Sequence, residues 1–172
     1  MNIKAEKMNK FLIDNKLTAR GREVPGDALH TIYLNLGSVH GFEYLIQIDD
    51  SPIIGVKAIF ARNVDPNTEG LLPLLNRLSG KYKTHSYIVD KEGFLCAPFA
   101  ALVDDNSFSP DLFIDYCTLV DHCIADDLPE MFELLGLELP ENFNAENDEE
   151  SEAEAVAETS EAEKDAGEAL GE

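Results

Sequence analysis

The residues of this chain best suited to chemistry are its cysteines and histidines. Cys117, His122 and Cys123 lie within seven residues of one another, and thiolate and imidazole groups are the ligands that zinc prefers. Their spacing matches none of the known zinc patterns, and the third thiol, Cys96, is far away in sequence. On a helix Cys123 falls on the apolar side and His122 does not. We therefore expect the cysteines to pack as small apolar side chains, with no metal and no cofactor.

The four histidines lie on separate segments of the chain, at His30, His40, His85 and His122. Catalytic groups meet in space rather than in sequence, so a small enzyme with a dispersed site built from His30, His85, Cys96 or His122 stays open as an alternative. No nucleophile elbow, phosphate-binding glycine loop or metalloprotease helix motif accompanies them. The sequence therefore favours a protein that is not an enzyme.

An acidic stretch at residues 104–107, Asp-Asp-Asn-Ser, has the oxygen ligands that a cation requires. It lacks the carboxylate spacing and the distal glutamate of a calcium loop. We expect a polar loop that joins a strand to a helix.

The charge of the chain limits its partners. The 172 residues carry a net charge of −21. Residues 140–172 hold 13 acidic residues and one lysine, a net of −12, and residues 1–139 hold 21 acidic and 12 basic residues, a net of −9. This balance excludes nucleic acid, which requires a basic surface, and anionic membrane surfaces. No apolar run approaches the roughly 20 residues of a spanning helix, and no signal peptide is apparent. Three cysteines form no disulfide framework, so we expect a cytoplasmic protein with reduced thiols.

The first half of the chain predicts a helix followed by three strands. Apolar residues at helical spacing indicate a helix over 3–16, and a glycine- and proline-containing loop follows at 18–27. Alternating apolar residues predict strands over 31–36, 42–48 and 54–60. Their short connections favour antiparallel hairpins.

The second half predicts helix, strand, strand, helix. Leucines at helical spacing indicate a helix from about residue 70 to Gly80, and two strands follow over 83–90 and 94–102. Pro98 requires the last strand to be an edge or to be bulged there. Ser109 and Pro110 mark the start of a final helix, which residues 126–129 interrupt and a short second piece, 130–135, completes.

These elements predict an α+β domain over residues 1–139 with a five-stranded antiparallel sheet, in the order α-β-β-β-α-β-β-α. Residues 140–172 contain too few apolar side chains to offset the entropy of ordering, so we expect a disordered acidic tail. Three helices do not obviously cover both faces of such a sheet. The apolar residues left over, Leu45, Ile88, Leu95 and Phe99, form the candidate protein-binding surface.

Two stretches of the chain resemble a known family. They are residues 71–96, LLPLLNRLSGKYKTHSYIVDKEGFLC, and residues 109–136, SPDLFIDYCTLVDHCIADDLPEMFELLG. Both are similar to YbjN-domain proteins, the bacterial sensory-transduction-regulator-like family, whose fold is similar to that of type III secretion chaperones. The resemblance extends over about residues 3–137 in element order and length. It implies a bacterial cytoplasmic protein that binds other proteins, often as a homodimer, and it brings no catalytic residues.

The leading hypothesis is a non-enzymatic protein-binding module that acts as a chaperone-like or regulatory adaptor on a protein client, with a homodimer as a possible form. Besides the dispersed enzyme site, a further alternative remains. In it the acidic tail binds a basic client, and the binding weakens as salt is raised.

Overall fold

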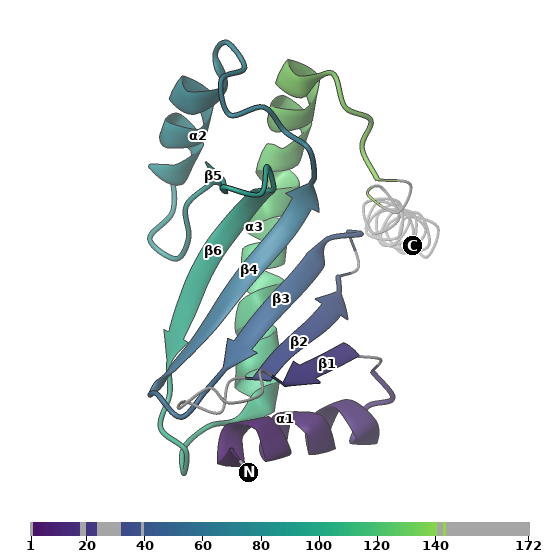
Figure 1. Ribbon diagram of the computed structural model, residues 1–172, viewed down its shortest axis with the longest axis vertical. Coiled ribbons are helices and arrows are strands. Elements are labelled where there is room, and N and C mark those ends of the chain that lie inside the picture. The colour runs from purple at the N-terminus through teal and green to yellow at the C-terminus, as the bar shows by residue number, and fades with distance from the viewer. Residues whose placement is uncertain (1, 18–19, 24–31, 39, 141–142, 144–172) are drawn as a thin grey trace, which may run out of the picture.

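The computed structural model describes residues 2–17, 20–23, 32–38, 40–140 and 143 of the chain (Figure 1). Three helices and six strands follow one another along it. They are α1 (Ile3–Asp14), β1 (Arg20–Glu23), β2 (Ile32–Gly37), β3 (Glu43–Ile48), β4 (Ile53–Ala61), α2 (Leu71–Ser79), β5 (Ile88–Val89), β6 (Leu95–Leu102) and α3 (Pro110–Leu135).

The strands form one antiparallel sheet in the order β1-β2-β3-β4-β6-β5. The predicted α+β class and the five predicted strands in their order are confirmed. The sixth strand, β1, comes from residues expected in a loop. Its sequence, Arg-Gly-Arg-Glu, carries no apolar alternation, and the strand pairs through its backbone with β2 at the edge of the sheet.

Strand β5 is shorter than the prediction of 83–90 because its first residues bond elsewhere. The backbone N–H of Tyr87 donates to Oγ of Ser79 at the end of α2, and the side chains of Thr84 and His85 contact each other at 3.0 Å. Only Ile88 and Val89 remain to pair with β6.

Pro98 lies on a free edge, one of the two possibilities that its position allowed. Strand β6 pairs with β4 along its length, whereas β5 pairs with it only at Leu95 and Cys96. The irregularity in the sheet is on the neighbouring strand, where the register of β4 shifts between Ile59 and Ala61.

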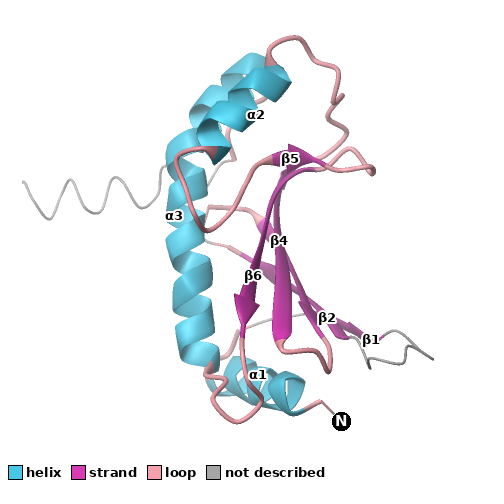
Figure 2. Cartoon of the chain, turned by 90° about the vertical axis from the view of Figure 1, so that its left-hand side faces the viewer, coloured by secondary structure: helices cyan, strands magenta, loops and turns pink. Residues whose placement is uncertain are grey.

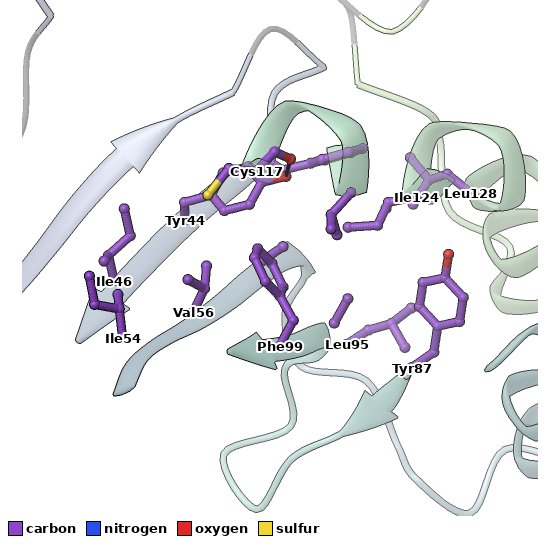
Figure 3. Packing of buried hydrophobic residues seen from close by; sticks show 14 of the residues in the cluster. Tyr44, Ile46, Ile54, Val56, Tyr87, Leu95, Phe99, Cys117, Ile124 and Leu128 are labelled. Atoms are coloured by element: carbon purple, nitrogen blue, oxygen red, sulfur yellow. Dashed lines mark hydrogen bonds between the residues drawn. The ribbon is translucent and has the colours of Figure 1, made fainter. Parts of the chain in front are cut away.

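Helix α3 runs along one face of the sheet, and α1 and α2 contact α3 near the two ends of the strands (Figure 2). Alternate strand residues point toward α3 and form the core, in which Ile46, Ile54 and Leu95 are fully buried. Figure 3 shows Leu95 pointing toward Ile124 and Leu128, which project from α3, and shows Ile46 and Ile54 farther away along the sheet. The opposite sheet face, toward the viewer in Figure 1, is covered by no helix of the described chain.

Helix α1 buries Met8 and Leu12, which belong to its apolar pattern, but it buries Lys4 in place of Ile3. Ile3 is 47% exposed, whereas Lys4 is 0% exposed. The amino group of Lys4 donates to the carbonyl of Ser51 at 2.5 Å and lies 3.1 Å from a carboxylate oxygen of Asp105. A buried ammonium requires such partners, and hydropathy alone does not reveal them.

Helix α3 continues without a break through the acidic segment that was expected to interrupt it. Pro129 lies inside the helix and is exposed. Its ring removes one N–H, so the carbonyl of Ala125 lacks its usual partner. Leu128, Met131 and Phe132 on the buried side of the same turns are at most 4% exposed, and this packing outweighs the lost bond.

Packing extends past residue 139, where the domain was expected to end. Phe143 is 8% exposed, its ring lies 6.1 Å from that of His40, and its N–H donates to the carbonyl of Pro140. The predicted disorder of the rest of the tail lies outside the described residues. No helix in the described ranges is long and apolar enough to cross a membrane.

Candidate functional site

The four residues predicted as a protein-binding surface divide between the two faces of the sheet. Leu95 and Phe99 are 0% and 7% exposed and lie in the core beneath α3, so they are not an exposed surface. The odd-numbered residues of β6 face α3. The number of helices predicted from the sequence does not show which face of β6 they cover. Leu45 is half-buried on the uncovered face, and Ile88 on β5 is 38% exposed.

The uncovered face holds a hollow of about 810 Å³. Its lining comes from β1, β2, β3, β4, β6 and the turn that follows β5. The residues that line it from this face are Gly21, Tyr33, Asn35, Leu45, Gln47, Gly55, Lys57, Lys91, Glu92 and Pro98. Val56 and Phe99 also contribute to the lining, although both are buried and belong to the core. We call this hollow the open-face hollow.

Strand register explains how these residues gather. One row across the sheet joins Asn35, Leu45, Lys57 and Pro98, which are successive partners on β2, β3, β4 and β6. The neighbouring row passes from Tyr33 through Gln47 and Gly55 to Ala100. Because paired residues in adjacent strands point to the same side, both rows face away from α3.

Gly55 forms the floor of the hollow. A Cβ added there would lie 3.8 Å from Cβ of Gln47, an ordinary contact. A side chain would therefore fit at this position, and it would fill space that glycine leaves open. The sequence pattern gave no signal for this role, since a strand glycine is more often read as a bulge.

Ion pairs fix the rim. The amino group of Lys57 lies 2.8 Å from a carboxylate oxygen of Asp90. This hydrogen bond raises the pKa of Lys57. Partial burial alone would raise the pKa of Asp90, but the bonds from Lys57 and from the backbone N–H groups of Phe94 and Glu92 outweigh it and lower that pKa. Both groups are therefore charged at neutral pH and neutralise each other.

The chemistry of the hollow suits binding. Its polar groups are amides, a phenol and charged side chains, and its exposed apolar contacts come from Leu45 and Pro98. Among the lining residues that the structure describes there is no histidine and no thiol that could act as a base or nucleophile.

Among the described residues, the groups of the predicted dispersed site, His85, Cys96 and His122, do not meet. His30 lies outside the described residues. His85 stacks on Tyr82 at 4.7 Å, His122 lies on the exposed side of α3, and the thiol of Cys96 is near the Lys57–Asp90 pair.

The thiols are protonated at neutral pH. Burial, with a smaller contribution from Asp90, raises the pKa of Cys96 to about 11, and burial beside Asp121 raises the pKa of Cys117 to about 12. Burial also raises the pKa of Cys123. In the described part of the chain, no three His, Cys, Asp or Glu side chains are arranged to hold a metal ion.

Sequence reasoning missed two buried carboxylates on α3. Asp121 is 3% exposed; the hydroxyl of Tyr44 donates to its Oδ1 at 2.8 Å, and Nδ1 of His40 contacts its Oδ2. Asp127 is 2% exposed; the hydroxyl of Tyr87 donates to its Oδ2 at 3.0 Å, and Lys81 pairs with its other oxygen. The sequence offered one signal for the burial of Asp127. It lies at helical spacing from Val120 and Ile124, which are on the apolar side of the helix.

These two groups are structural by their geometry. Each tyrosine hydroxyl also lies 3.3 Å from a helix carbonyl four residues before the aspartate, that of Cys117 for Tyr44 and that of Cys123 for Tyr87. Burial and the adjacent carboxylate raise the pKa of both tyrosines. In the described residues no buried side-chain nitrogen or oxygen lacks a hydrogen bond.

The acidic loop after β6 binds lysines of the chain itself. The amino group of Lys7 donates to the carbonyls of Asp105 and Asn106 at 2.8 and 3.0 Å and lies 3.3 Å from that of Phe108, and Lys4 pairs with the Asp105 carboxylate. These ammonium groups take the place that a cation would occupy, so the loop connects α1 to the β6–α3 junction.

Comparison with known proteins adds no relative from which a role could be transferred. No family model matches this chain, and neither a curated protein nor a solved structure matches it.

Proposed function

We propose that the protein is a non-enzymatic protein-binding module, a chaperone-like or regulatory adaptor of a bacterial cytoplasm, which holds an extended segment of a client protein across the open-face hollow. The observation that carries the proposal is the hollow itself, about 810 Å³ on a sheet face that no helix of the described chain covers.

The shape of the hollow favours a polypeptide over a small molecule. Small-molecule sites are concave and enclose most of their ligand. This hollow instead spreads over β1, β2, β3, β4 and β6. Strands lie about 4.8 Å apart, so five of them span about 19 Å, the length of an extended segment of roughly six residues.

The lining fits a chain of mixed composition. Leu45 and Pro98 supply apolar contact, and Asn35 and Gln47 supply amide groups that can pair with a backbone. The net charge of −21 favours a client that is basic. The resemblance to YbjN-domain proteins supports a protein partner, and a second copy of the chain is the competing occupant.

Filling the floor of the hollow tests the proposal. Gly55→Val adds a β-branched side chain where an added Cβ has only an ordinary contact, and valine favours a strand. We expect the full chain carrying this change to fold normally. In affinity capture from the host lysate, it should lose the client that the unchanged chain retains.

The matched control is Gly37→Val, also in a strand, where an added Cβ meets nothing within 4 Å. Gly37 does not line the open-face hollow, so this variant should capture the client normally. Equal capture by both variants would remove the hollow as the binding site. Capture that depends only on residues 144–172 and weakens with salt would instead favour the tail-driven alternative.

A further inference from the structure

Beyond Cys96, the outer edge of β6 carries backbone groups with no strand beside them among the strands that the structure describes. The N–H of Val103 donates to the carbonyl of Pro52 at 2.8 Å, which fixes the phase of the β4–β6 ladder. Bonding direction alternates along an antiparallel strand. Odd-numbered residues of β6 therefore bond to β4, and even-numbered residues direct their N–H and C=O groups outward. Strand β5 uses this edge only at Leu95 and Cys96.

Residues 98–102 are consequently an open template. Pro98 is an even-numbered residue, so the N–H that it lacks would have pointed away from β4 and the sheet loses no bond. Ala100 and Leu102 direct N–H groups outward, and both side chains are exposed, Leu102 by 81%. An exposed apolar edge of this kind accepts a further strand.

An apolar groove lies next to this edge on the helix side of the sheet. Its volume is about 240 Å³, and the end of β6, the loop that follows and the first two turns of α3 line it. Leu112 on that wall is 70% exposed, Tyr116 is half-buried, and Leu119, one turn further along α3, is 56% exposed. Exposed leucines in a row on a helix are expected where a partner covers them.

The charges around the groove select the partner. Asp104, Asp111 and Asp115 are exposed in the loop and on α3. Lys4 and Lys7, the nearby basic residues, are bound to the loop from α1. A second copy of the chain would bring three more exposed aspartates to the same junction, and its net charge is −21. A basic segment meets no such repulsion.

We propose that the β6 edge binds an extended basic segment of a partner protein as a seventh strand. Alternate apolar side chains of that segment enter the groove beside Leu112 and Tyr116, and lysine or arginine side chains face the three aspartates. The inference rests on the proposed function only in that the partner is a protein, because the surface is a different one.

The test uses the full chain and a phage-displayed library of random dodecapeptides. The peptides selected should alternate apolar with other residues and carry lysine or arginine. On binding a synthetic copy, the amides of Ala100 and Leu102 should exchange more slowly with solvent. Ala100→Pro removes one outward N–H, at a position that faces the same way as Pro98. It should weaken peptide binding about tenfold, because one backbone hydrogen bond to the peptide is lost and the next one is less well aligned.

Two leucine variants separate the groove from a general effect. Leu112→Gln should weaken binding at least about threefold. Leu72→Gln, at an equally exposed leucine on α2 (63% exposed), should not change it. Because Leu112 is exposed, Leu112→Gln should fold normally, and it tests the proposal even if Ala100→Pro alters folding.

Several outcomes would overturn the proposal. They are selection of no peptide, peptides with helical spacing, full affinity for Ala100→Pro and Leu112→Gln, or a dimer in sedimentation that Ala100→Pro dissociates. Peptides that lose binding to Gly55→Val but keep it for Ala100→Pro would support the open-face hollow and reject the edge. Peptides that keep binding to Gly55→Val but lose it for Ala100→Pro would support the β6 edge alone as the binding site.

Discussion

At the scale of single residues, the buried hydroxyls of Tyr44 and Tyr87 each donate a hydrogen bond to a carboxylate in the core, that of Asp121 and that of Asp127. We predict that Tyr44→Phe lowers the free energy of unfolding by about 1–3 kcal/mol, because Asp121 and the carbonyl of Cys117 lose a shared donor. Urea denaturation measures this change. Tyr33→Phe, a half-buried tyrosine on the uncovered face, is the control and should change stability by less. Equal effects of the two variants would contradict the role given to the hydroxyl of Tyr44.

His85 predicts how stability depends on pH. Burial lowers the pKa of His85 below its usual 6.5, and the nearby Asp127 only partly opposes this. The unfolded chain therefore binds more protons at this residue near pH 6 than the folded chain does. The stability that depends on neutral His85 is fully present above pH 6.5, and it is lost as the pH falls from there toward and through the pKa of His85 in the folded chain.

We therefore expect the free energy of unfolding to decrease between pH 7 and pH 5, and to decrease less steeply in His85→Gln. Urea titrations at a series of pH values give the slope. The exposed His122 offers a matched change, His122→Gln, which should leave this component of the slope in place. A slope that His85→Gln does not alter would show that the protonation of His85 is not linked to folding.

At the scale of elements, the unbroken course of α3 through Pro129 makes a prediction opposite to the one that its sequence favours. If the helix is continuous, Pro129→Ala restores an N–H to the free carbonyl of Ala125. We expect it to raise the free energy of unfolding by about 1–3 kcal/mol, since proline is about 3 kcal/mol less favourable than alanine within a helix and its stiffness in the unfolded chain offsets part of that. A chemical-denaturation midpoint measures the gain. Loss of stability would favour the break expected from the sequence.

The errors at this scale have one physical origin. The alternation of β2, β3 and β4 and the Ser109 cap of α3 are local signals, and the structure places those elements as expected. Strand β1 depends on backbone pairing with β2, and the truncation of β5 depends on bonds to Ser79. Such bonds join segments far apart in the chain, and local periodicity contains no information about them.

The same reasoning applies to the candidate site. Its polar side could be predicted, because the residues alternating with the core must face the other way. The exposed residues of β6 could not be predicted, because apolar residues occupy both faces of that strand and only the position of α3 decides that Leu95 is buried. The outward N–H groups of β6 follow from register, which no single strand specifies.

At the scale of the whole molecule, Phe143 joins the end of the described chain to His40 in the turn between β2 and β3. We predict that Phe143→Ala lowers the free energy of unfolding by about 3–5 kcal/mol, the range for truncating a large buried aromatic side chain to alanine. Thermal or urea unfolding of the full chain tests this, with Leu139→Ala, at 37% exposure, as a control of smaller effect. No change would mean that the fold ends before residue 140.

The two tyrosine–aspartate pairs also determine where α3 can sit. Asp121 and Asp127 are six residues apart, so at about 100° per residue they project from the helix axis in directions about 120° apart. One is held by β3 and the other by the segment before β5. A helix with only apolar side chains on its buried face could rotate or shift by one turn against the sheet at a small cost in packing free energy, because one leucine would replace another. Here any such slip would strand both carboxylates without donors, so the acids that cost most to bury are the ones that give this helix a single alignment.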